Sequence, residues 1–304
     1  MKTFNLSRDL PEVSRVGLGC MRIDSLSAEK VQAIIETALE NGINFFDHAD
    51  IYGGGRSEEV FGKALTPSLR DKMFIQTKCG INPGISFDFS KKHIIESVDG
   101  SLKRLGTDHV DSLLLHRPDA LVEPEEVAEA FDELTRDGKV KTFGVSNQNP
   151  MQMELLNRCC DNRIQINQIQ LSIAHCPTID AGLNVNIHSD AGWDRDGGII
   201  EYSRLKNITL QAWSPFQYGM FEGTFIGSDK FPKLNEVLTR LAEKYDVTEN
   251  AIAVAWLLRH PAGIQVIVGT TGLDHIKGLC KAPDVELTRE EWYELYLSAG
   301  KILP

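Results

Sequence analysis

The sequence lacks the long apolar segments and the basic excess that would point to a membrane or a nucleic acid. No run of 18 apolar residues occurs, so we expect no transmembrane helix. The 32 Lys and Arg residues are outnumbered by 43 Asp and Glu residues, and the net charge of −11 disfavours nucleic acids and anionic membrane surfaces as partners. Residues 1–9 contain no apolar core, so we expect no signal peptide and a cytoplasmic protein.

Two common site signatures are also missing. The six cysteines show neither zinc-ligand spacing nor a disulfide framework, and adjacent Cys159 and Cys160 have poor geometry for a bridge. We therefore expect reduced thiols and no bound metal. No G-x-G-x-x-G opens a helix after the first predicted strand, and residues 53–55 lack the required spacing, so a Rossmann nucleotide domain is not supported.

Short apolar runs alternate with longer amphipathic stretches along the whole chain, which is the pattern of repeated βα units. The predicted strands are residues 15–20, 44–47, 73–78, 109–116, 142–146, 166–171, 209–214 and 265–269. The predicted helices are residues 28–40, 58–64, 91–105, 125–136, 151–158, 233–245 and 249–259. Gly42, Gly106 and Gly138 follow three of them, where a helix end favours a left-handed residue.

Eight strands without a Pro/Gly/Ser-rich linker predict one domain over residues 1–304, an α/β fold of the (β/α)8 TIM-barrel type. Residues 174–198 and 216–231 break the alternation and follow strands, so we expect two long loops over the carboxyl-terminal face of the barrel. Periodicity does not reveal closure, and a doubly wound open sheet is the alternative.

Four titratable residues close or follow predicted strands. Asp47 and Lys78 each end a strand, Tyr52 comes five residues after Asp47, and His116 ends a third strand. Because the carboxyl ends of parallel strands meet at one rim, we expect these side chains to converge. Groups of complementary kind at one rim predict a proton-transfer site.

Several segments occur in one order from residue 17 to about residue 280. They are Gly17-Leu-Gly19, Phe46-Asp47-His-Ala-Asp-Ile-Tyr52-Gly53, Thr77-Lys78, Leu102-Lys-Arg-Leu-Gly106, Leu115-His116-Arg-Pro118-Asp119, Gly144-Val-Ser146-Asn147, Asn167-Gln168 and Ala212-Trp213-Ser214-Pro215. Together they resemble the aldo-keto reductases, and most of all a bacterial oxidoreductase subgroup with Asp-His-Ala-Asp-Ile-Tyr-Gly, Lys-Cys-Gly and His-Arg-Pro-Asp motifs. The resemblance implies a (β/α)8 barrel that reduces a small carbonyl substrate, an aldehyde or ketone, with a nicotinamide cofactor, usually NADPH.

By this resemblance Asp47, Tyr52, Lys78 and His116 match the catalytic tetrad of the family. A carbonyl that receives a hydride gains negative charge on its oxygen, so a positioned donor must stabilise and protonate it. Tyr52 is the expected acid, and we expect Lys78 to lower its pKa from the usual value of about 10. Asp47 would orient Lys78, and His116 would donate a second hydrogen bond to the carbonyl.

The resemblance also assigns cofactor contacts. It places Ser146, Asn147 and Gln168 on the nicotinamide carboxamide, and Trp213 where a stacking Tyr is common. Two strand-end segments offer backbone amides and hydroxyls to the phosphates. They are Ser214, Pro215 and Phe216 in the first, and Gly269, Thr270, Thr271 and His275 in the second.

Three positions depart from the family pattern. Residues 269–272 replace the usual Lys and Arg that hold the 2′-phosphate, so NADH is an alternative to NADPH. Met21 and Arg117 stand where tryptophans are frequent, which predicts a more polar pocket. Arg117 suggests an acidic group on the substrate, although Asp119 is an alternative partner for it.

Two other classes of function remain open. One is a non-catalytic nicotinamide-binding sensor or subunit of the same fold, for instance attached to a channel. The other is a metal-dependent hydrolase barrel with His48, Asp50 and His116 as ligands, although their irregular spacing disfavours it. The sequence does not predict an oligomeric state.

Overall fold

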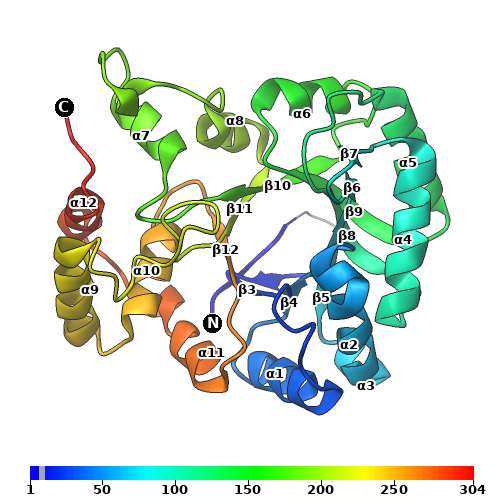
Figure 1. Cartoon of the computed structure of the whole chain (residues 1–304), viewed down its shortest axis with the longest axis horizontal. Helices are drawn as coiled ribbons and strands as arrows, with labels where there is room; N and C mark the ends of the chain where they lie inside the picture. Colours follow the sequence, from blue (N-terminus) through cyan, green and yellow to red (C-terminus); the bar gives the residue numbers. More distant parts are fainter. Residues whose placement is uncertain (7–10) are drawn as a thin grey trace.

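A computed structural model describes residues 1–6 and 11–304 and shows eight parallel strands closed into a barrel (Figure 1). In order around the barrel the strands are β3 (Val16–Gly19), β4 (Phe45–Asp47), β5 (Phe74–Cys79), β8 (Val110–Leu115), β9 (Val140–Ser146), β10 (Ile164–Gln170), β11 (Thr209–Trp213) and β12 (Gln265–Val268). Pairing of Val266 with Val16 joins the last strand to the first. The TIM-barrel prediction is confirmed, and the open-sheet alternative is wrong.

The predicted helices are confirmed to within two residues at each end. They are α1 (Ala28–Glu40), α2 (Arg56–Ala64), α4 (Lys91–Leu105), α5 (Pro124–Arg136), α6 (Pro150–Asn157), α9 (Pro232–Tyr245) and α10 (Glu249–Leu258). In α4 both ends follow from the sequence: the Ser90 side chain accepts a hydrogen bond from the His93 amide, and Gly106 ends the helix at φ +65°.

Several further helices are not predicted from the sequence. They are α3 (Pro67–Arg70), α7 (Pro177–Leu183), α8 (Ile199–Lys206), α11 (Leu273–Leu279) and α12 (Arg289–Ser298). For α12 a readable signal exists, because Thr288 and Glu291 form a capping box at its start. For α7 and α8 the Gly-, Asn- and Asp-rich surroundings hide the helical period.

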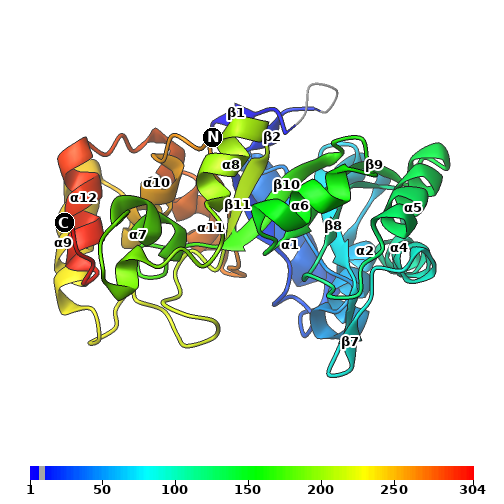
Figure 2. The same ribbon diagram turned by 90° about the horizontal axis from the view of Figure 1, so that it is seen from above.

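The two ends of the barrel differ, because only the amino-terminal end is closed by a plug. At the amino-terminal end, the hairpin of β1 (Thr3–Phe4) and β2 (Val13–Ser14) covers an apolar plug in which the rings of Phe45 and Phe74 stack 5.1 Å apart. Figure 2 shows this hairpin on one side and the β6–β7 hairpin (Ile81–Asn82 and Ser86–Phe87) on the other. The plug leaves the carboxyl-terminal end as the open face.

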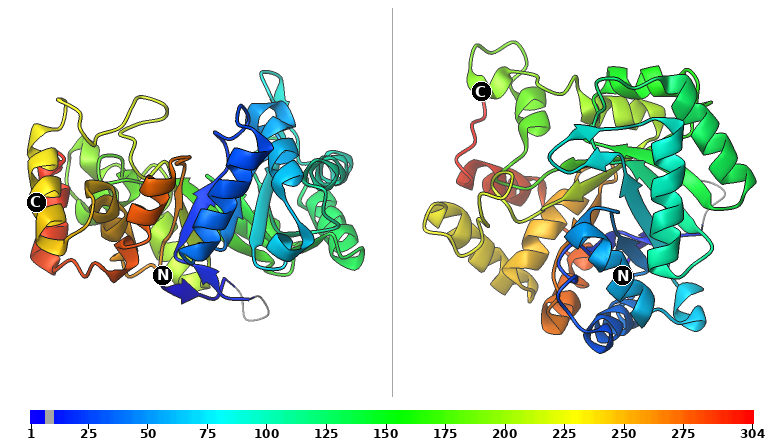
Figure 3. Two further views of the ribbon diagram at one scale, coloured as in Figure 1. Left: turned by 90° about the horizontal axis from the view of Figure 1, so that it is seen from below. Right: turned by 45° about the vertical axis from the view of Figure 1, so that its right-hand side comes forward.

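The long loops lie on that open face, as predicted. Residues 171–198 follow β10 and include α7, and residues 214–231 follow β11 (Figure 3). Across residues 1–6 and 11–304, no helix combines the length and apolarity that a membrane crossing needs. Residues 7–9 of the segment read for a signal peptide lie outside the described residues.

Candidate active site

A fully buried ammonium lies at the centre of the candidate site. The Nζ of Lys78 on β5 donates to Asp47 Oδ2 at 2.7 Å, to the carbonyl oxygen of His48 at 2.8 Å and to the hydroxyl of Tyr52 at 3.1 Å. An ammonium has three N–H donors, and all three are used. Its side chain has no exposed surface, so the charge depends on these partners.

The chain reaches Tyr52 by continuing the strand pairing beyond β4. The amides of His48 and Asp50 donate to the carbonyls of Gln76 and Lys78 on β5. Tyr52 then opens a 3₁₀ turn whose next three residues, 53–55, are glycines at φ +59°, +65° and +93°. Only glycine adopts such a run without strain, which explains the Gly-Gly-Gly sequence after the tyrosine.

Asp47 is fixed on its other side by side-chain amides. Its Oδ1 accepts from Gln76 Nε2 at 2.6 Å and from Gln168 Nε2 at 3.1 Å. Both amide groups also donate to Gln211 Oε1, and Gln211 donates to Gln265. These four glutamines are buried in the barrel interior and connect Asp47 to strands across the barrel.

The amide array is the part of the site that the sequence reasoning misses. Strand register places Gln76 beside Asp47, and Gln211 between Gln168 and Gln265. Ser112 on β8 joins the array by donating to Gln76 Oε1 at 3.0 Å. A glutamine within an otherwise apolar strand is a detectable signal, because a buried amide needs partners.

His116 lies next to Tyr52, whose hydroxyl contacts the Lys78 ammonium. Its ring is 6.0 Å from the Tyr52 ring, centroid to centroid, and nearly perpendicular to it. Burial, followed by the charges of Lys78 and Arg117, lowers the pKa of His116 well below 6.5. The imidazole is therefore neutral at neutral pH and has one N–H to donate.

The pKa of Tyr52 differs from the expected direction. Burial raises it above 10, and the Lys78 ammonium opposes this rise without reversing it. For Lys78, burial lowers the pKa, but Asp47 and Tyr52 outweigh it and the net pKa lies above 10.5. At neutral pH Tyr52 therefore carries its proton and Lys78 its charge, which is the state that a general acid requires.

Three of the predicted nicotinamide contacts hydrogen-bond to one another at the ends of β9 and β11, the two strands that flank β10. Ser146 Oγ accepts from Asn147 Nδ2 at 2.7 Å, and Asn147 Oδ1 accepts from Trp213 Nε1 at 3.2 Å. Gln168 is close by, since its carbonyl oxygen accepts from Ser146 Oγ at 2.8 Å. Asn147 has a left-handed φ of +54°, a conformation that asparagine tolerates and that often marks functional positions.

The predicted phosphate contacts leave the adjacent strands β11 and β12. Ser214 has φ +51°, Pro215 is buried, and Phe216 packs partly against the core. After β12, exposed Gly269 and Thr271 lead into α11, with the Thr270 hydroxyl accepting from the Gly272 amide at 3.2 Å. His275 is exposed on α11. The two segments therefore present backbone and hydroxyl groups side by side.

His48 and Asp50 do not form a metal site with His116. The His48 ring is fully buried, contacts Phe61 edge-on at 4.4 Å between centroids, and has a pKa lowered to about 3 by burial and then by Lys78. Burial, followed by the charge of Glu58, raises the pKa of Asp50 to about 7. In the described part of the chain, no three His, Cys, Asp or Glu side chains are grouped to hold a metal ion.

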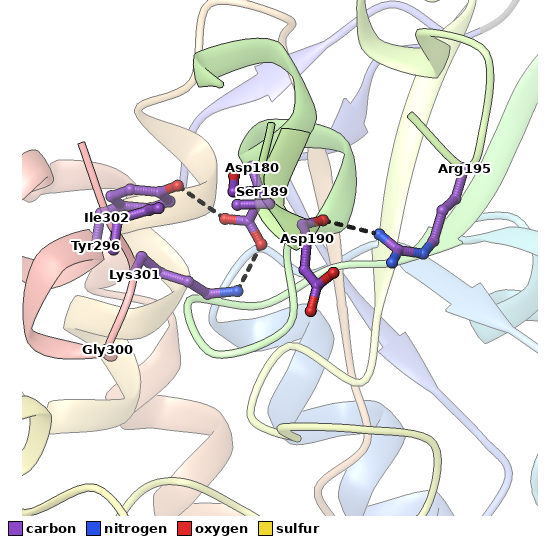
Figure 4. Close-up of a pocket in the computed structure, with 9 residues that line it drawn as sticks. Asp180, Ser189, Asp190, Arg195, Tyr296, Gly300, Lys301 and Ile302 are labelled. Atoms are coloured by element: carbon purple, nitrogen blue, oxygen red, sulfur yellow. Dashed lines mark hydrogen bonds and ion pairs between the residues drawn. The ribbon is translucent and has the colours of Figure 1, made fainter. Parts of the chain in front are cut away.

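A separate hollow of about 430 Å³ lies between the loop of residues 171–198 and the carboxyl-terminal segment (Figure 4). Its Asp180 carboxylate accepts from the Tyr296 hydroxyl at 2.8 Å and from Lys301 Nζ at 2.7 Å. None of its lining residues belongs to the group around Lys78. These contacts tie α7 to α12 and to the segment that follows α12.

Comparison with known proteins identifies relatives of the chain and of its fold. The model of the Aldo/keto reductase family matches residues 15–296. A 6-dehydroglucose reductase from Agrobacterium fabrum is 38% identical over 317 aligned residues, which cover 99% of each chain. The solved structure of a thermostable aldo-keto reductase with the inhibitor epalrestat has a TM-score of 0.79 at 26% identity and covers 98% of this chain and 100% of its own. An aldo-keto reductase from Klebsiella pneumoniae in complex with NADPH shares the fold, with a TM-score of 0.76 at 24% identity over 93% of this chain and 90% of its own.

The amide array of Gln76, Gln168, Gln211 and Gln265 leads to a first prediction, on stability. Gln76→Leu removes a donor to Asp47 and leaves the Ser112 hydroxyl without its acceptor, so we expect the free energy of unfolding to fall by about 2 kcal/mol. Urea denaturation measures the change. Gln32→Leu is the matched control, since Gln32 bonds only to Glu36 on the surface of α1 and its loss should cost less than about 0.5 kcal/mol. Equal effects would show that the array contributes nothing specific.

The raised pKa of Asp50 leads to a second prediction, on how the stability of the protein depends on pH. Its pKa is about 7 in the folded chain and 3.8 ordinarily, so between these values the unfolded chain releases a proton that the folded chain keeps. The contribution of Asp50 to the free energy of unfolding is therefore greatest at acid pH. It decreases as the pH rises from about 4 and is lost once the pH has passed 7. Asp50→Asn should therefore gain stability relative to the native protein, by about 2 kcal/mol between pH 5 and pH 8. Urea denaturation at both pH values checks this, with exposed Asp274→Asn as control; a constant difference would contradict the prediction.

Proposed function

Because the chain belongs to the aldo/keto reductase family, we propose that it reduces an aldehyde or ketone to an alcohol with a nicotinamide cofactor and with Tyr52 as general acid. The observation that carries the proposal is the contact of Lys78 Nζ with both Asp47 and the Tyr52 hydroxyl. An ion pair that only stabilised the fold would not need a phenol hydroxyl as the acceptor for the third N–H of the ammonium. The complete group of four also favours an enzyme over a non-catalytic sensor.

Each residue has a role that follows from its protonation state. The Tyr52 hydroxyl and the neutral His116 ring donate hydrogen bonds to the substrate carbonyl oxygen and polarise it. When bound, the reduced nicotinamide supplies the hydride for the carbonyl carbon. Tyr52 then gives its proton to the oxygen, and the Lys78 ammonium at 3.1 Å stabilises the phenolate that remains. Asp47 keeps Lys78 charged and directed at Tyr52.

The residues at the open face fit a dinucleotide. Ser146, Asn147 and Trp213 already hydrogen-bond to one another, and a carboxamide offers the same donors and acceptors in exchange. The Gln168 amide nitrogen is committed to Asp47 and Gln211, so Gln168 contributes its side-chain oxygen as an acceptor.

The phosphates are assigned to the segments after β11 and β12. Ser214, Pro215 and Phe216 would contact the pyrophosphate. Gly269 has open space where a side chain would begin, so its backbone can approach a ligand closely. Thr270, Thr271 and His275 would complete the site near the 2′-phosphate. We propose NADPH as the cofactor and NADH as the alternative, since hydroxyls and one imidazole discriminate less than an arginine fork.

The proposed substrate class is a sugar aldehyde. The Agrobacterium fabrum relative is named for the reduction of a glucose oxidised at carbon 6. A polar pocket suits such a substrate, and here Arg117 lies beside the reacting groups in place of an aromatic side chain.

Cofactor binding and turnover test the proposal together. NADPH should quench the fluorescence of Trp213 at micromolar concentrations, because the nicotinamide would stack on its ring. An aldehyde should then consume the NADPH, followed at its absorbance maximum. Trp213→Phe should lose the quenching, whereas Trp193→Phe, at an exposed position outside the site, should keep it. Absence of binding by NADPH and NADH below millimolar concentrations would contradict the assignment.

Tyr52→Phe isolates the acid. Removing the hydroxyl should lower kcat by about 10²-fold or more, the scale of general acid catalysis, with unchanged NADPH affinity. Tyr202→Phe serves as the control, because the Tyr202 hydroxyl bonds to Glu154 away from the site and its loss should not affect turnover. Equal rates for Tyr52→Phe and the native protein would remove Tyr52 from its role.

A further inference from the structure

One arginine of the open face has a ring contact but no hydrogen-bond or ion-pair partner within residues 1–6 and 11–304. Arg117 directly follows His116, and its guanidinium carbon lies 5.7 Å from the centroid of the Trp213 ring. The side chain is half-buried, and burial lowers its pKa, an effect that nearby Tyr52 opposes. The guanidinium therefore lies among the groups assigned to the substrate carbonyl and the nicotinamide.

The expected alternative partner of Arg117 is occupied elsewhere. Asp119 uses Oδ2 to accept from the Phe89 amide at 2.9 Å and Oδ1 to accept from the Leu121 amide at 2.8 Å. Both bonds hold loop backbone, so Asp119 has a structural role of its own. The proposal that Asp119 neutralises Arg117 is wrong.

Within residues 1–6 and 11–304, Arg117 forms no ion pair and no hydrogen bond. Other partly buried arginines differ: Arg70 pairs with Asp111 at 2.9 Å, and Arg104 pairs with Glu58 at 2.8 Å. A guanidinium has five N–H donors, and losing water without gaining acceptors is unfavourable. An oxygen acceptor that enters the site would recover this cost.

We infer that Arg117 selects the substrate by binding an oxygen on the carbon next to the reacting carbonyl. Arg117 follows His116 in the chain and lies over the Trp213 ring. Its guanidinium is therefore beside the position that the substrate carbonyl takes in the proposed function, on which this inference rests. The preferred substrates are then α-oxygenated carbonyl compounds. The oxygen belongs either to a carboxylate or to a hydroxyl or ring ether, as in an aldehyde at carbon 6 of a pyranose sugar. All of these accept hydrogen bonds from a guanidinium.

The experiment compares three aldehydes: propanal, 2-hydroxypropanal and glyoxylate. Each value of kcat/KM is expressed relative to the same substrate with the native protein, so differences in aldehyde hydration cancel. Arg117→Met should lower the ratio of 2-hydroxypropanal to propanal by about 10- to 100-fold, the range for hydrogen bonds to a charged group. Arg117→Lys should restore part of the ratio, because it keeps the charge but loses the fork.

Two controls complete the design. Arg136→Met removes an exposed arginine at the end of α5, whose partner is Asp137, and should leave the ratio unchanged. A larger loss for glyoxylate than for 2-hydroxypropanal in Arg117→Met identifies a carboxylate as the natural acceptor, and a comparable loss identifies a neutral oxygen. A ratio that Arg117→Met and Arg117→Lys change by less than about 3-fold, as in the control, overturns the inference.

Calorimetric binding of glycolate, which has no carbonyl to reduce, separates this inference from the proposed function. If the native protein reduces none of the aldehydes, the reductase proposal fails, but glycolate still reports on Arg117. A loss of about 10-fold or more in glycolate affinity in Arg117→Met supports the oxygen-binding site. Unchanged affinity, or no measurable glycolate binding by the native protein, refutes it.

Discussion

The burial of the Lys78 ammonium is the constraint on which the rest of the site depends. A buried ion whose partner is removed costs about 3–5 kcal/mol, so the charge must be matched on every side. Asp47, the His48 carbonyl and the Tyr52 hydroxyl meet this need. The same contacts orient the proposed acid, so the arrangement that the buried charge needs is also the one that the proposed chemistry needs.

This constraint divides the barrel interior into two halves. Near the amino-terminal end, apolar side chains such as Phe45 and Phe74 fill the barrel and supply stability. Nearer the open face, Gln76 and Gln168 replace apolar packing, because the second oxygen of Asp47 also needs donors. Amides are suited to this place, since both donate to the carboxylate and to Gln211, and the Gln76 side-chain oxygen in turn accepts from Ser112 and Gln211. The amides that orient Asp47 at the carboxyl-terminal rim therefore occupy positions in the barrel that apolar side chains would otherwise fill.

The sequence predicts the strands and the convergence of the four titratable residues well, because both follow from local period and from strand ends. The sequence does not predict features that depend on contacts between residues far apart in the chain. The glutamine array depends on strand register, which hydrophobic alternation in fully buried strands does not reveal. Helix α12 is recognisable only from its capping box, and α7 is short and held by tertiary contacts. The direction of the Tyr52 pKa depends on the balance of burial against Lys78, and no motif contains that balance.

The two cations near the reacting groups, Lys78 and Arg117, differ in a way that favours Tyr52 as the proposed proton donor. Lys78 has three hydrogen-bond partners, whereas Arg117 has no hydrogen-bond or ion-pair partner in the described part of the chain, and both positive charges act on His116 in addition to its burial. An imidazole between two cations remains neutral, so it offers a hydrogen bond but no acidic proton at neutral pH. The Tyr52 hydroxyl accepts a hydrogen bond from the ammonium, and this contact becomes stronger as the hydroxyl becomes a phenolate. In the proposed mechanism, the electrostatics of the site therefore separate binding of the carbonyl oxygen by His116 from its protonation by Tyr52.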